Sequence, residues 1–130
     1  MNRFLQIATI VLATLLLLAL AVLSVRGMLD PRAAAHAFGV PAADESAAFY
    51  HAVYRDRNLV LSLVGIAFLC SRMWRALAIL VTISISLPAY DITVLKLAQV
   101  PVAPAHTATL VSLVVLAVVS WLHVLKTKAP

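Results

Sequence analysis

The stretch that most constrains the fold is residues 4–25, FLQIATIVLATLLLLALAVLSV, which contains 22 residues and no charged side chain. Arg3 and Arg26 bound it. At about 1.5 Å per residue, a helix of this length extends about 33 Å, enough to cross the hydrocarbon core of a bilayer. Ala19-Leu20-Ala21 also fits the cleavage site of a signal peptide, but the apolar run continues beyond the usual length of a signal core. We therefore expect residues 4–25 to form the first membrane span.

The composition of the whole chain is also typical of a membrane protein. Of the 130 residues, 64% are hydrophobic and 12% are charged, and the mean hydropathy is +1.04. Because soluble domains are nearer half apolar and a quarter charged, this composition excludes a soluble globular enzyme, a disordered tail and a disulfide-framed secreted module. Four spans of about 20 residues would use about 80 positions and leave about 50 for loops and ends. Residues 1–130 contain no repeat or linker and are expected to form a single domain.

Capping residues, proline and glycine indicate where the next helices begin and end. Asp30-Pro31 is typical of an N-cap followed by the first helical residue, and Gly39 is typical of a helix end. A short helix at the membrane interface is therefore expected between them. Asp44 or Ser46 can cap the following helix, which nothing interrupts up to residue 70.

Three further uncharged stretches follow, at residues 58–71, 76–90 and within 97–125. The first is short for a span, so the aromatic half of that helix must contribute, with Tyr50 and Tyr54 at the level of the lipid headgroups. Pro88 removes a backbone donor and should kink the third span, and Pro101 and Pro104 precede the fourth. The sequence thus predicts an all-α integral membrane protein, a four-transmembrane-helix up-down bundle with a short interfacial helix after the first span.

The distribution of basic residues favours a lipid partner and argues against a nucleic acid partner. The 10 Lys and Arg residues exceed the 5 Asp and Glu residues, but they are scattered singly between apolar runs. Such charges fix orientation and contact anionic lipid. With four spans, each side carries five basic residues, and the balance favours cytoplasmic termini in the inner (plasma) membrane only if Arg55 and Arg57 are partly buried. Small residues on the first and fourth spans leave homo-oligomerisation open.

Polar residues within spans are costly and usually mark function or a paired contact. The candidates for a ligand-binding site are Tyr54, Arg55, Arg57, Asn58, Asp91 and His106. Because Arg57 begins the second span, Asp91 lies near the end of the third and His106 begins the fourth, an alternating topology places them at one membrane face. We expect a pocket formed by these three residues, and helical geometry leaves open whether Arg55 or Arg57 points into it.

Several chemical interpretations of this cluster remain open. The favoured one is a ligand-binding or helix-locking cluster for a small lipophilic molecule, in which an arginine holds Asp91 ionised. The first alternative is a membrane-embedded enzyme of the isomerase, cyclase or hydrolase type, with Asp91 or His106 as the catalytic acid or base. The second is a small proton-coupled carrier. The chain has no multiple-histidine motif and a single cysteine, Cys70, so no metal site and no cofactor are expected.

Several short motifs occur in a fixed order along nearly the whole chain: Asp30-Pro31, Phe38-Gly39-Val40-Pro41, Arg57, Pro88-x-x-Asp91 and His106. This order resembles a family of uncharacterised bacterial membrane proteins, domain of unknown function 4267. In that family the start of the second span typically reads Arg-Asp, with a glycine several residues later. Asn58 and Ser62 stand at those two positions here, so the resemblance implies no acid role for residue 58. It implies a four-helix integral membrane protein and no established activity.

Overall fold

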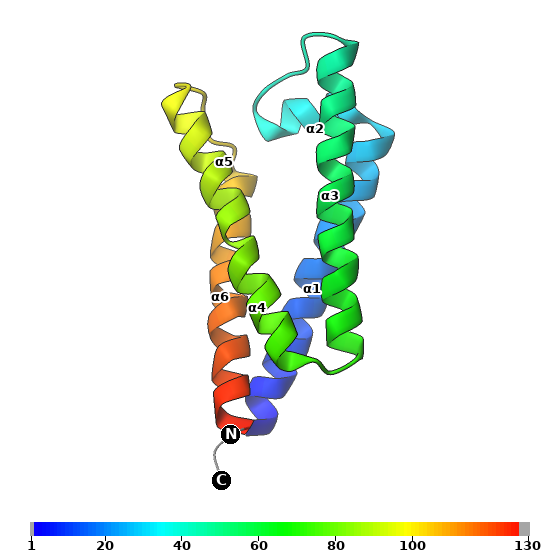
Figure 1. The fold of residues 1–130 in the computed structure, drawn as a ribbon. Helices are drawn as coiled ribbons and strands as arrows, with labels where there is room; N and C mark the ends of the chain where they lie inside the picture. Colours follow the sequence, from blue (N-terminus) through cyan, green and yellow to red (C-terminus); the bar gives the residue numbers. More distant parts are fainter. Residues whose placement is uncertain (1, 128–130) are drawn as a thin grey trace.

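The computed structural model describes residues 2–127, which form helices joined by short connections and contain no strand (Figure 1). The helices are α1 (Asn2–Leu29), α2 (Pro31–Phe38), α3 (Glu45–Cys70), α4 (Trp74–Ser84), α5 (Ser86–Leu97) and α6 (Pro104–Thr127). Within the described chain, α1, the α4–α5 segment (Trp74–Leu97) and α6 are long and apolar enough to cross a membrane. The expected all-helical fold with membrane-span-like helices is confirmed.

The long helices are arranged as two antiparallel pairs. α1 packs mainly against α3, and α4 and α5 pack against α6, while α1 and α6 join the two pairs. The start of α1, the end of α6 and the turn between α3 and α4 lie at one end of the bundle (Figure 1). The short helix α2 and the connection between α5 and α6 lie at the opposite end, which we call the α2 end.

The expected boundaries of the short helix and of the helix after it are confirmed. The Asp30 side chain accepts a hydrogen bond of 3.0 Å from the backbone N–H of Ala33 and so caps α2. Gly39 ends α2 with a φ of 103°, a left-handed conformation that glycine adopts without a steric penalty. The Asp44 side chain caps α3 in the same way, by accepting from the N–H of Ala47 at 2.8 Å.

Pro88 interrupts the third long helix, as its sequence predicts. The α-helix stops at Ser84 and resumes at Ser86 as α5, with Ile85 in a turn between them. Proline has no N–H to donate to the carbonyl four residues earlier, and its ring would clash with that carbonyl, which belongs to Ser84. Ile85 keeps right-handed helical dihedral angles, with φ −58° and ψ −32°, so the break is one residue long.

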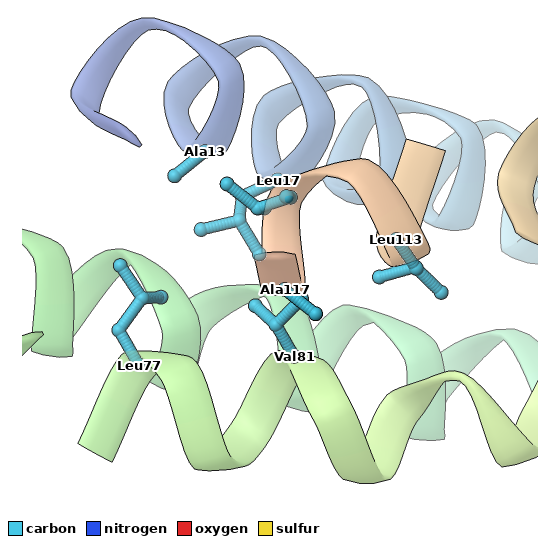
Figure 2. Close-up of a cluster of buried hydrophobic side chains, with 7 residues drawn as sticks. Ala13, Leu17, Leu77, Val81, Leu113 and Ala117 are labelled. Carbon is cyan, nitrogen blue, oxygen red and sulfur yellow. The ribbon is translucent and has the colours of Figure 1, made fainter. Parts of the chain in front are cut away.

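A cluster of buried apolar side chains fills the half of the bundle that contains the start of α1 and the end of α6. Figure 2 shows it where α1, α4 and α6 meet. Its members are Ala13, Leu17, Leu77, Val81, Leu113, Leu116 and Ala117. Most other large apolar side chains are exposed, including Phe4 at 73% and Leu15 at 64%. A protein with a small core and such an apolar exterior fits a lipid environment better than water.

Close approach of α1 and α3 depends on two glycines. A Cβ atom added to Gly65 of α3 would lie 2.7 Å from Leu17 Cδ2 of α1. A Cβ atom added to Gly27 of α1 would lie 2.9 Å from both Cγ and Nε of Arg55 in α3. Small residues at helix crossings allow backbones to approach closely in membranes. The two contacts therefore fix the rotation of α3 relative to α1.

We predict that Gly65→Val lowers the free energy of unfolding by about 1–3 kcal/mol, because the larger side chain overpacks the contact with Leu17. Thermal unfolding in detergent micelles, followed by circular dichroism, measures the change. Ala67→Val is the control, since Ala67 lies exposed on the same helix. Adding Leu17→Ala should restore part of the loss. A Gly65→Val protein as stable as the Ala67→Val protein would contradict the close-packing account.

Candidate functional site

A partly enclosed cavity of about 220 Å³ lies between the two helix pairs, and all six helices contribute to its lining. Towards the middle of the bundle the lining is apolar and includes Leu20, Leu61 and Leu80. Towards the α2 end the lining carries its ionisable and amide side chains, namely Tyr54, Arg55, Asn58, Asp91 and His106. Four serine and threonine residues also line the cavity, and the hydroxyls of Ser62 and Ser84 donate to carbonyls of their own helices. The cavity is therefore amphipathic along its length.

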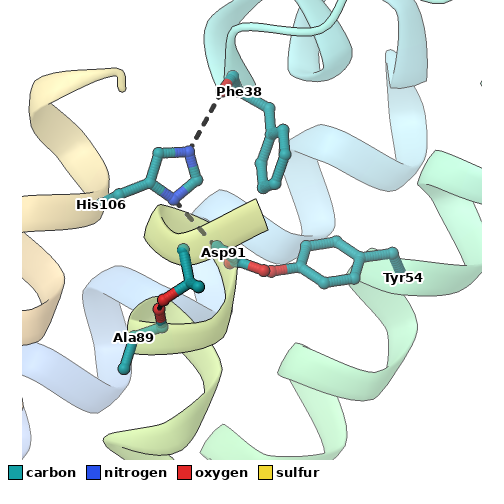
Figure 3. Close-up of polar contacts among 6 residues, drawn as sticks. Phe38, Tyr54, Ala89, Asp91 and His106 are labelled. Atoms are coloured by element: carbon teal, nitrogen blue, oxygen red, sulfur yellow. Dashed lines mark hydrogen bonds and ion pairs between the residues drawn. The ribbon is translucent and has the colours of Figure 1, made fainter. Parts of the chain in front are cut away.

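The polar end is organised around one carboxylate oxygen, Asp91 Oδ2 (Figure 3). The Tyr54 hydroxyl donates a hydrogen bond to it at 3.0 Å, and Nδ1 of His106 lies 3.8 Å from it. The Asp91 and His106 side chains are only 16% and 9% exposed. This contact joins α3, α5 and α6 across the space between the helix pairs.

His106 also contacts α2. Its Nε2 lies 3.1 Å from the backbone carbonyl of Phe38. Because a carbonyl only accepts hydrogen bonds, this contact requires a hydrogen on Nε2. When Nδ1 also carries a proton, His106 forms an ion pair with Asp91. Both ring nitrogens are therefore directed at groups of the protein.

The Phe38 ring closes the same end of the cavity by edge-on aromatic contacts. Its centroid lies 4.5 Å from that of His106, 5.8 Å from that of Tyr54 and 5.4 Å from that of His51. Edge-to-face pairs at these distances are favourable beyond the area they bury. Since Tyr54 and His51 belong to α3 and His106 belongs to α6, Phe38 bridges both helix pairs.

The structure brings together most of the residues expected at the site, but not Arg57. Asp91 and His106 lie within ion-pair distance, and Tyr54, Arg55 and Asn58 line the same cavity. Arg57 is exposed and does not line it. Residues two positions apart on an α-helix are separated by about 200° of rotation, so Arg55 and Arg57 cannot both face the cavity.

The partners of Asp91 also differ from the arginine expected from the sequence. Within residues 2–127, its polar contacts are with Tyr54 and His106, and no arginine nitrogen lies within 4.0 Å of it. Phe38 lines the cavity but was not among the candidate residues, because it contacts the site through its carbonyl and its ring. The one sequence signal for Phe38 is its position directly before Gly39, the residue that ends α2. No group of His, Cys, Asp and Glu suited to a metal occurs in the described range.

The fold and this cavity define an all-helical protein with membrane-span-like helices and a polar-ended space between them. The chain belongs to the family described as a domain of unknown function, DUF4267, whose model matches residues 17–123. The family expected from the order of the motifs is thus confirmed. The match includes Tyr54, Arg55, Asn58, Asp91 and His106. No curated protein and no solved structure shows significant similarity to the chain.

We predict that Tyr54→Phe costs about 1 kcal/mol of stability, because it removes the hydrogen bond to a poorly solvated carboxylate. A double-mutant cycle with Asp91→Asn, measured by thermal unfolding in micelles, tests whether the two residues interact. Tyr50→Phe is the matched control, since Tyr50 is 70% exposed. Strictly additive losses for Tyr54→Phe and Asp91→Asn would show that the contact contributes nothing.

Proposed function

We propose that this protein is a multi-pass membrane protein with four spans that binds a small lipophilic molecule in the cavity between its helix pairs. The observation that carries the proposal is the amphipathic lining, with leucines at one end and Tyr54, Asp91 and His106 at the other. Ligand sites are typically concave and mostly apolar, with a few polar groups that fix orientation. A molecule with one polar group and an apolar body matches this lining.

The packing of α3 against α1 supports four spans. α3 has 26 residues and α1 has 28, so the two helices are of similar length. α3 is less apolar because Arg55, Asp56 and Arg57 lie in its middle. Since α3 runs antiparallel beside α1, a bilayer that encloses α1 encloses much of α3 as well. Arg55 faces the cavity, which reduces the contact of its charge with lipid.

The same arrangement suggests an orientation. The connections at the α2 end and α2 itself would lie at one interface, with both chain ends and the α3–α4 turn at the other. Removing the partly buried Arg55 from the count leaves a small excess of basic residues at the end with the termini, which favours cytoplasmic termini in a plasma membrane. Lipid is then the surrounding partner, and no nucleic acid is required. Six helices of one chain line the cavity, so a second copy is not needed to complete it.

Single-cysteine labelling in sealed vesicles tests the four-span topology. In a Cys70→Ser background, we predict that a membrane-impermeant maleimide labels Ser71→Cys from one side and Ser46→Cys from the other. Ser71 follows the end of α3, and Ser46 lies in its first turn. Detergent-opened vesicles provide the control for reactivity. Labelling of both positions from the same side would show that α3 does not cross the membrane.

The size of the cavity restricts the ligand. A dry cavity of about 150 Å³ holds one benzene molecule, so a space of about 220 Å³ suits a ligand of roughly ten non-hydrogen atoms. A phospholipid with two long chains is far larger. The probe 1-octanol has a suitable size, one neutral polar group and an apolar chain.

A second candidate is an acid–base enzyme acting on the same kind of molecule, because Asp91 and His106 both line the cavity. Binding without conversion is favoured by the contacts of His106. One ring nitrogen is engaged with the Phe38 carbonyl and the other faces Asp91, so neither is directed at a ligand. The Tyr54 hydroxyl is likewise used by Asp91.

Methyl NMR of the protein in lipid nanodiscs tests binding with 1-octanol as the probe. We predict saturable shifts for the methyl groups of Leu20, Leu61 and Leu80, which line the cavity. Leu15 and Leu18 are exposed outside it at 64% and 51%, so they report non-specific partition into lipid.

A bulky residue in the cavity should abolish the saturable shifts. Ser84→Leu places such a side chain in the lining, whereas Ser86 lies outside it. Both serine hydroxyls donate to a carbonyl of α4, at 2.8 Å for Ser84 and 2.7 Å for Ser86. Ser86→Leu is therefore the matched control and should bind octanol as the unmodified protein does. Equal, non-saturable shifts at cavity and lipid-facing leucines would refute the binding function.

A further inference from the structure

The guanidinium group of Arg55 lies at the polar end of the cavity, and the described residues place no carboxylate against it. Within residues 2–127, no carboxylate oxygen lies within 4.0 Å of its nitrogens. Its Nε is buried and has no hydrogen-bond partner. The side chain passes Gly27 of α1, contacts the Tyr54 ring with its central carbon 5.9 Å from the centroid, and lines the cavity.

Asp91 does not form an ion pair with Arg55, because none of its oxygens lies within 4.0 Å of the guanidinium nitrogens. Asp91 Oδ2 accepts from Tyr54 and faces His106, so its contacts are made with other residues. The second ion pair in the described chain, between Arg32 and Glu45, joins two exposed side chains outside the cavity lining. A partly buried charge is costly unless it is paired and hydrogen-bonded. A molecule in the cavity is well placed to provide that pairing.

We propose that the ligand is a single-chain lipophilic carboxylate, held with its carboxylate against Arg55 and Asn58 and its chain among the leucines. The inference rests on the binding function proposed above and names its ligand class. An arginine side chain matches the planar carboxylate and donates to it more strongly than to a neutral oxygen. Asn58 lines the cavity one turn after Tyr54 and offers a further donor.

The charge balance favours a carboxylate over a phosphate monoester. A carboxylate carries one negative charge, which equals the single charge of Arg55. A phosphate monoester carries about −1.5 to −2 at neutral pH and would bring excess negative charge close to Asp91. The volume of about 220 Å³ also limits the chain to a medium length.

Comparing octanoate with 1-octanol tests the proposal, because the two probes share an eight-carbon chain and differ in the polar group. With the leucine methyl shifts as the readout at neutral pH, octanoate should bind about tenfold more tightly than octanol, as expected for a hydrogen bond between charged partners. Arg55→Gln should remove this advantage, so that octanoate and octanol bind with similar affinities. Arg57→Gln is the matched control, since Arg57 lies two residues later on α3 and is exposed. It should keep the full advantage.

A second variant covers the case in which Arg55→Gln does not fold. Gly27→Ala keeps the charge but places a Cβ atom 2.9 Å from Arg55 Cγ and Nε, which must shift the guanidinium. The octanoate advantage should fall in this variant too. Equal binding of octanoate and octanol by the unmodified protein would overturn the carboxylate assignment while leaving the binding function intact. Tighter binding of octyl phosphate than of octanoate would overturn it as well, and the absence of saturable binding by every probe would overturn both proposals.

Discussion

The contact of Asp91 Oδ2 with Tyr54 and His106 is the constraint on which the α2 end of this protein depends. The apolar cluster holds α1, α4 and α6 together only in the half nearer the chain ends. At the α2 end the helix pairs enclose a cavity, so polar contacts across it hold the two pairs at a defined separation. A weakly solvated carboxylate requires such partners, because few water molecules can replace them. His106 then extends the link to α2 through the Phe38 carbonyl.

The break at Pro88 and the position of Asp91 belong to the same arrangement. Ser84, Pro88 and Asp91 lie on one face, and all three line the cavity. A regular helix would have an N–H at residue 88 and would pack more continuously against its neighbours. Proline removes that donor just before the acidic residue. The interruption thus lies beside the cavity. Asp91 follows it within two helical turns and accepts a hydrogen bond from Tyr54 of α3.

The sequence predicted those features that depend on local chemistry. Asp30, Gly39, Asp44 and Pro88 act on their own backbone within a few residues, so each boundary could be located without knowledge of packing. The proximity of Asp91 and His106 followed from the alternation of helix directions. Which of Arg55 and Arg57 faces the cavity could not be predicted in this way, because the rotation of α3 depends on its contact with another helix. The contact of Phe38 was not predicted either, since every residue has a backbone carbonyl and only the packing of α2 brings this one to His106.

The rotation of α3 links packing to the proposed site. Leu17 of α1 packs against Gly65 of α3, and the side chain of Arg55 in α3 packs against Gly27 of α1. Turning α3 by about 200° would exchange Arg55 for Arg57 but would also lose both glycine contacts. The close packing therefore selects which arginine reaches the cavity. α3 thus supplies Tyr54, Arg55 and Asn58 to the lining, while α5 and α6 supply Asp91 and His106.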